Sequence, residues 1–155
     1  MQLTDILKPQ CIRVPLDATD RQGAIYELVD LLAAEGTITD AEAARSAVWQ
    51  RESTRTTGIG AGLAIPHGKC VGCDSLTMAI GKPAEPIDFQ SIDHQPVNLI
   101  FLLVSQPDQT GPHIQSLARV SRLMEDDAMK AKMANAQSAE EIYQLISEHE
   151  AAGVE

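Results

Sequence analysis

Aromatic and basic side chains are both scarce in this sequence. Phe, Trp and Tyr make up 3% of its 155 residues, so aliphatic side chains must supply most of the hydrophobic core. Lys and Arg number 12 against 22 Asp and Glu, which gives a formal net charge of −10. So acidic a surface repels nucleic-acid backbones and anionic lipids, and it argues against proteins that bind either. The same charge favours a basic protein as partner.

Long apolar runs and a signal peptide are also missing. No apolar run approaches the roughly 20 residues of a membrane-spanning helix, and residues 1–9 lack the basic start and apolar centre of a signal peptide. Three cysteines are an odd number, which fits reduced thiols better than a disulfide framework. We therefore expect a cytoplasmic protein without membrane insertion, with one domain over residues 1–150 and a tail over 151–155.

Patterns typical of helices lie at both ends of the chain. Three pairs have the spacing of a capping box: Thr19 with Gln22, Thr39 with Glu42, and Ser138 with Glu141. They predict helices that begin at these Thr and Ser residues, the second of which ends near Arg51. Apolar periodicity predicts two more helices over residues 112–124 and 127–136.

Patterns typical of strands lie in the middle of the chain. Short apolar segments predict strands at residues 63–65, 76–80 and 97–104. The last is almost entirely apolar, as expected of a central strand covered on both faces. This order of elements predicts an α/β fold, in which a single three-layer domain has a mixed sheet of about five strands flanked by helices.

The segment of residues 51–69, RESTRTTGIGAGLAIPHGK, holds the residues best suited to chemistry. Glycine-rich backbone can direct several N–H groups at phosphate oxygens, and arginine offers a bidentate charge. A neutral imidazole is a competent nucleophile near pH 7, because its usual pKa is about 6.5. We predict His67 as the nucleophile and Arg51 as the stabilising charge. The predicted phosphate-binding residues are Thr56, Thr57, Gly58 and Gly60.

Other interpretations stay open on the residues alone. A single histidine after a strand is more often structural than catalytic, and the glycines lack the Gly-Lys-Ser/Thr end of a P-loop. Cys70 and Cys73 form a C-x-x-C pair, which supplies only two of the four ligands of a structural zinc site, so we predict no metal site. The pair leaves open a non-enzymatic redox or binding module.

The sequence resembles the type 2 IIA family of the phosphotransferase system (PTS). The stretches that resemble the family are Arg51 with Glu52, residues 57–60, 63–68, 87–97, 113–122 around a second histidine, and 138–146. Residues 3–7 resemble the nitrogen-type members in particular. The resemblance implies the type 2 IIA fold and a phosphotransferase that needs no cofactor.

The same resemblance implies roles for individual residues and partners. His67 would accept phosphate from the carrier protein HPr, which is supplied from phosphoenolpyruvate through enzyme I. Arg51 and His113 would flank the phosphoryl group. The recipient would be a IIB component, for a sugar-specific IIA protein in carbohydrate uptake, or regulatory target proteins, for a nitrogen-type regulator. The opening segment and the free-standing length favour the regulator.

Overall fold

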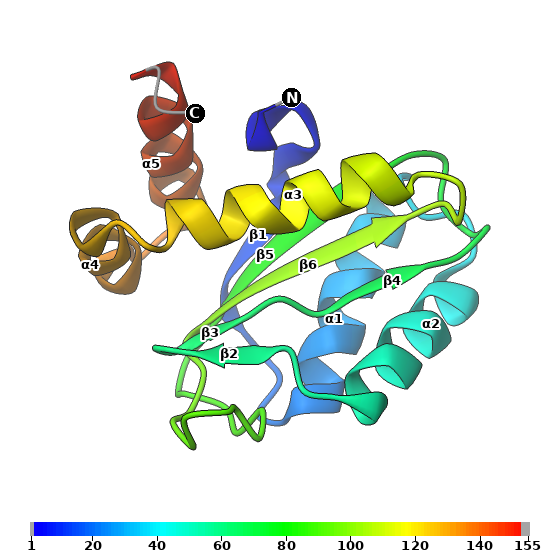
Figure 1. The fold of residues 1–155 in the computed structure, drawn as a ribbon, viewed down its shortest axis with the longest axis horizontal. Coiled ribbons are helices and arrows are strands. Elements are labelled where there is room, and N and C mark those ends of the chain that lie inside the picture. Colours follow the sequence, from blue (N-terminus) through cyan, green and yellow to red (C-terminus); the bar gives the residue numbers. More distant parts are fainter. Residues whose placement is uncertain (1, 153–155) are drawn as a thin grey trace.

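The computed structural model describes residues 2–152, which form a three-layer α/β arrangement (Figure 1). A six-stranded mixed sheet lies in the middle. Helices α1 and α2 cover one face of the sheet, and α3, α4 and α5 cover the other. The predicted α/β fold is confirmed, with one strand more than expected.

The elements alternate irregularly along the chain. The helices are η1 (Leu3–Asp5), α1 (Arg21–Ala34), α2 (Ala41–Thr54), α3 (Thr110–Leu123), α4 (Asp127–Asn135) and α5 (Ala139–Ala151). The strands are β1 (Leu7–Leu16), β2 (Gly58–Gly60), β3 (Leu63–Ala64), β4 (His67–Lys69), β5 (Thr77–Pro83) and β6 (Leu99–Ser105). The sheet order is β1-β5-β6-β3-β2, and β4 follows β3 along the same edge of β6. Strands β5 and β6 are antiparallel, whereas β3 and β4 run parallel to β6.

Strand β6 is the centre of the molecule, and every residue in it is buried. Its alternate side chains enter two separate cores, with Leu99, Phe101 and Leu103 on the α3 side and Ile100, Leu102 and Val104 on the α1 side. Successive side chains of a strand point to opposite faces, so a strand covered on both faces must be apolar throughout. The central strand predicted over residues 97–104 is therefore confirmed.

The first two long helices start one residue later than predicted. Asp20 and Asp40 are the N-caps, rather than Thr19 and Thr39. Each aspartate accepts a hydrogen bond from the backbone N–H at i+3. Its negative charge also suits the positive end of the helix dipole, which a threonine hydroxyl cannot match. At α5 the predicted cap is confirmed, because Ser138 accepts from a first-turn N–H at 3.1 Å.

Three strands have no clear signal in the sequence. Strand β1 contains Pro9 and Pro15, which interrupt the apolar pattern but are tolerated because β1 is an edge strand. Strands β2 and β4 are only three residues long and rich in glycine. Glycine-rich sequence favours turns, yet residues 58–60 form β2.

The first and the last helix lie close together, and the N–H groups of Leu3 and Thr4 in η1 bond to the carboxylate of Glu150 in α5 (Figure 1). The tail predicted over residues 151–155 overlaps α5, because Ala151 is the last residue of that helix. Residues 153–155 lie outside the described part of the chain. Among residues 2–152, no helix has the length and apolar character needed to cross a bilayer.

Candidate functional site

His67 begins β4, and its ring is half-buried. Ring atom Nδ1 lies 2.8 Å from the carbonyl oxygen of Ile65. A carbonyl only accepts, so Nδ1 carries the hydrogen of the neutral ring and Nε2 keeps its lone pair. Burial lowers the pKa of His67 from 6.5, and the charge of Arg51 lowers it further against the raising effect of the Ile65 hydrogen bond. At pH 7 the ring is therefore neutral, with its nucleophilic nitrogen at Nε2.

His113 lies in the first part of α3 and is only 3% exposed. Its ring centroid is 5.4 Å from that of His67, and the ring planes meet at 66°. Its Nδ1 lies 2.6 Å from Oγ of Ser105, the last residue of β6. Burial, followed by His67 and Lys69, lowers the pKa of His113 to about 4. When the Ser105 hydroxyl donates to Nδ1, the neutral ring carries its hydrogen on Nε2, which becomes a donor.

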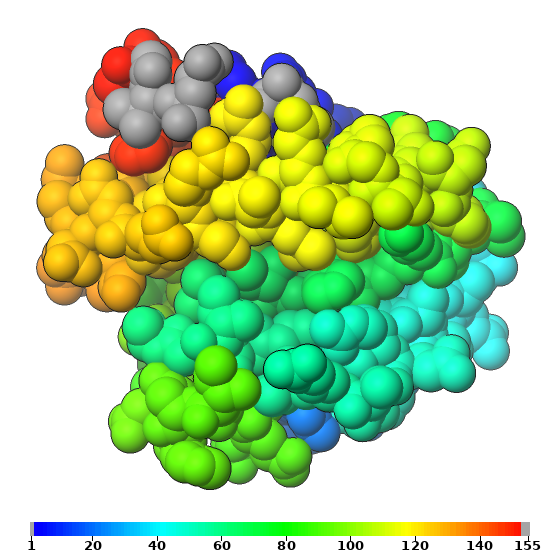
Figure 2. Space-filling view, in the orientation of Figure 1, coloured from blue at the N-terminus to red at the C-terminus, as the bar shows by residue number. Residues whose placement is uncertain are grey.

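The site lies where two segments distant in sequence meet. In the space-filling view, α3 forms a ridge across the face, and the segment that carries β2 to β4 lies directly beside it (Figure 2). The two histidine rings contact each other at this boundary. The pair is therefore assembled by the docking of α3 on the sheet.

Two cationic side chains flank the histidines, although the chain as a whole carries a net charge of −10. Arg51 lies in the last turn of α2, and its Nη1 donates to the carbonyl of Arg55 at 2.8 Å. Lys69 ends β4, and its Nζ donates to Oγ1 of Thr110 at 2.8 Å. The charge of Lys69 lowers the pKa of both histidines, and that of Arg51 lowers the pKa of His67. Both cations therefore attract an anion on Nε2 of His67, whereas the charge of Glu52 acts on His67 in the opposite direction.

Gly68 lets α2 lie close against β4. A Cβ at this position would be 3.0 Å from the backbone nitrogen of Val48 in α2. Only glycine fits such a close approach without displacing the helix. The small-residue face of α2, which includes Ala44, therefore packs directly on β4 and places Arg51 beside His67.

Glu52 holds the glycine-rich segment to the end of α2. Its carboxylate is 1% exposed, and its two oxygens accept from the N–H and the hydroxyl of Thr57 at 2.8 and 2.6 Å. A buried carboxylate needs such bonds, because losing them would leave an uncompensated charge. We expect Glu52 to fix the shape of the segment that leads from Arg51 to His67.

The residues predicted to bind phosphate form bonds within the protein. Besides the bonds from Thr57 to Glu52, the hydroxyl of Thr56 donates to a backbone carbonyl and accepts from the N–H of Gly58. Gly60 has a φ of +106°, a conformation that favours glycine for reasons of backbone shape alone. Phosphate binding by this segment therefore stays a prediction.

The structure thus brings three predicted residues together, His67, His113 and Arg51, from β4, α3 and α2. Two further members of the site, Lys69 and Ser105, were not predicted. Lys69 has a usable signal, because residues two apart in a strand share a face and His67 is two positions earlier. Ser105 has no such sequence signal, because a serine at the end of an apolar strand is not distinctive.

Cys70 and Cys73 lie in the turn that follows β4. Both thiols are free and buried, with exposed fractions of 9% and 1%. Burial, and then the neighbouring Cys70, raise the pKa of Cys73 to about 11. A thiol held protonated is a poor nucleophile and a poor metal ligand. Over residues 2–152, no group of three or more His, Cys, Asp or Glu is placed to hold a metal ion.

Known proteins are similar to this chain over nearly its whole length. The family model for the phosphoenolpyruvate-dependent sugar phosphotransferase system, EIIA 2, matches residues 5–149. A nitrogen regulatory protein of Bradyrhizobium diazoefficiens is 35% identical over 147 residues, which cover 95% of each chain. The fructose-specific EIIABC component of Bacillus subtilis is 29% identical over 150 residues, which are 97% of this chain but 24% of that protein.

Solved structures agree with the sequence relatives. The crystal structure of the nitrogen regulatory protein IIA-Ntr from Neisseria meningitidis matches with a TM-score of 0.84 at 27% identity, over 92% of this chain and 97% of that one. The fold is therefore the type 2 IIA fold. Proteins of this family are phosphoryl carriers, and their IIA domains pass phosphate to IIB components. The extent of these matches shows that the chain belongs to the EIIA 2 family of the phosphoenolpyruvate-dependent phosphotransferase system.

Proposed function

We propose that this chain is a phosphotransferase component that accepts a phosphoryl group from HPr on Nε2 of His67. The observation that carries the proposal is the bond from Nδ1 of His67 to the Ile65 carbonyl, which leaves Nε2 as the free nucleophile. The lowered pKa of His67 keeps that nitrogen unprotonated at pH 7. Nothing else in the transfer requires a cofactor, because phosphoryl transfer depends mainly on positioning and charge.

The transfer step forms one bond and breaks one. The lone pair on Nε2 of His67 attacks phosphorus in line with the leaving group of the donor. The bond between phosphorus and the donor atom breaks, and its electron pair stays on the donor. Since Nδ1 already holds the ring hydrogen, Nε2 has no proton to lose and a general base is unnecessary.

Charge on the transferred group is stabilised by neighbours on three elements. Arg51 and Lys69 supply positive charge, which opposes the repulsion expected from the acidic remainder of the chain. His113 donates from Nε2 to a phosphoryl oxygen while Ser105 holds its Nδ1. These groups are already in place before the phosphoryl group arrives, and such preorganisation is what lowers the barrier.

The recipient is proposed to be one or more regulatory target proteins in the cytoplasm. The nitrogen regulatory relative, which is 35% identical over 147 residues, supports this recipient. A second candidate is a sugar-specific IIA protein that hands phosphate to a IIB component, as the relationship to a fructose-specific protein suggests. In both cases the chemistry at His67 is the same, and only the protein that docks next differs.

The test is reconstitution with phosphoenolpyruvate, enzyme I and HPr. We expect one acid-labile phosphate per chain, and a phosphorus NMR signal typical of a phosphoimidazole substituted at Nε2. Leaving out HPr should abolish labelling. Stable phosphate, labelling without HPr, or no labelling at all would contradict the proposal.

A further inference from the structure

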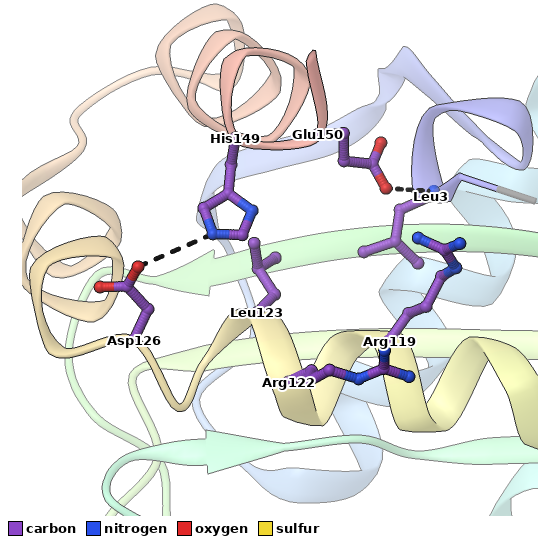
Figure 3. A pocket seen from close by; sticks show the side chains of 7 residues that line it. All are labelled: Leu3, Arg119, Arg122, Leu123, Asp126, His149 and Glu150. Carbon is purple, nitrogen blue, oxygen red and sulfur yellow. Dashed lines mark hydrogen bonds and ion pairs between the residues drawn. The ribbon is translucent and has the colours of Figure 1, made fainter. Parts of the chain in front are cut away.

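A cavity lined by two arginines lies at the far end of α3 from His113, between α3, α5 and η1 (Figure 3). Its volume is about 100 Å³. The lining comprises Arg119, Arg122, His149, two leucines and two carboxylates. This cavity contains none of the residues of the phosphoryl site.

The two arginines of this cavity have no partner among residues 2–152. Neither guanidinium forms a hydrogen bond or an ion pair with another described residue, and Figure 3 draws none. Arg119 is partly buried and extends from α3 toward Leu3 and Glu150, while Arg122 extends along α3 beside it. An arginine offers five N–H donors in a planar fork, so a pair of free arginines at a cavity is well suited to an oxyanion.

The carboxylates that line the cavity are already occupied. Glu150 is 9% exposed and accepts from the N–H of Leu3 at 2.6 Å and from the N–H and hydroxyl of Thr4, both at 3.1 Å. Asp126 caps α4 through backbone N–H groups and lies 3.7 Å from Nε2 of His149. These oxygens bond to groups of η1, α4 and α5 and to neither guanidinium, so the N–H donors of both arginines stay available to a ligand.

We infer that this cavity binds a small carboxylate, whose oxygens are held by Arg119 and Arg122. The side chains of Leu3 and Leu123 form apolar walls, against which a short carbon chain packs. Phosphate has no such chain, so the walls favour a carboxylate over inorganic phosphate. The volume of about 100 Å³ is well below the roughly 300 Å³ at which sites for larger ligands begin, which excludes nucleotides. The inference is independent of phosphoryl transfer at His67.

The test is a titration of the ¹⁵N-labelled chain with succinate and, separately, with inorganic phosphate, followed by NMR at constant ionic strength. Succinate should produce saturable shifts in the N–H signals of Leu3, Thr4 and the last turns of α3. Phosphate should bind there more weakly. Because the shifts are assigned residue by residue, binding at the cavity is distinguished from binding beside His67.

Substitutions of the arginines identify the site. Arg119→Gln and Arg122→Gln should each weaken succinate binding by about tenfold, as expected for the loss of a charge-assisted hydrogen bond. Arg45→Gln is the matched control, because it removes the same charge from α2 on the other face of the sheet. It should change the affinity by less than about twofold.

Three results would overturn the inference. They are the absence of saturation at succinate concentrations on the order of 10 mM, tighter binding of phosphate than of succinate, and an equal loss of affinity in all three variants. Unchanged NMR spectra of the free variants, away from the substituted residues, would show that the effects do not come from misfolding.

Discussion

His67 and Cys73 are two potential nucleophiles in one short stretch of chain, and burial has opposite consequences for them. The surroundings of each favour the uncharged form, which lowers the pKa of His67 and raises that of Cys73 to about 11. For an imidazole the uncharged form is the nucleophile, whereas for a thiol it is the unreactive form. The same physical effect therefore prepares one side chain for chemistry and disables the other.

The two regions also differ in the charges around them. Arg51 and Lys69 act on His67, where they favour its neutral ring and attract an anion. Around Cys73 the contributions come from Cys70 and Asp74, and both raise its pKa. A motif visible in the sequence therefore gains chemical meaning only from its local burial and charge.

Removal of the His67 imidazole should have the largest effect. His67→Ala should abolish phosphate uptake from phospho-HPr, because His113, the other imidazole of the site, is only 3% exposed and its Nδ1 is held by Ser105. The double variant Cys70→Ala, Cys73→Ala is the control and should keep the rate within about twofold. Labelling is measured as acid-labile phosphate per chain. Full labelling of His67→Ala would show that His67 is not the nucleophile. Loss of labelling in the cysteine variant would show that the thiols take part in transfer.

Loss of the Arg51 guanidinium should slow transfer without abolishing it. We expect Arg51→Ala to reduce the rate of phosphate uptake by about 10² or more, the usual cost of one preorganised group that stabilises charge. Single-turnover transfer from phospho-HPr measures this rate. Arg45→Ala, on the same helix but paired with Asp30, serves as the control. Equal rates for both variants would mean that Arg51 is only a surface charge.

The thiol pair should be protected in the folded chain. A rise in the pKa of Cys73 from 9.0 to about 11 reduces its thiolate fraction at neutral pH by about 10². Cys73 should therefore react with a thiol-specific disulfide reagent at least about 10² more slowly in the native chain than in denaturant. Peptide mapping after labelling identifies the cysteine. Rapid native labelling of Cys73 would favour the redox module that the C-x-x-C pair suggests.

Acid should destabilise the fold through His113. Its pKa is 6.5 in the unfolded reference and about 4 in the folded chain, so between these values the unfolded state binds more protons. Stability is therefore lost as pH falls from 6.5 towards 4, by on the order of 3 kcal/mol from this group.

Denaturant unfolding at pH 7 and at pH 4 measures this loss. His113→Gln should show a smaller loss of stability than the wild type over this range, because the buried titrating group is gone. The exposed His94 provides the control, and His94→Asn should keep the wild-type loss. The same loss in all three chains would assign the acid sensitivity to other groups.

Much of the fold follows from local pattern. The apolar run in β6 and the Ser138 cap of α5 depend on neighbouring residues only, and both were predictable. Strand β1 was not, because Pro9 and Pro15 hide its pattern and its edge position depends on the whole sheet. The N-caps at Asp20 and Asp40 were missed by one residue, since two adjacent residues could each serve as a cap.

The sequence alone determined which residue types are available for chemistry, namely an imidazole after a glycine-rich segment, an arginine before it and a second imidazole far along the chain. Tertiary structure decided which of them meet, which nitrogen is free and which charges act. It placed the Ser105 hydroxyl against the His113 ring, and it buried Cys70 and Cys73. The physical reason is that burial and charge depend on residues from distant segments, and these come together only when α2 and α3 pack on the sheet.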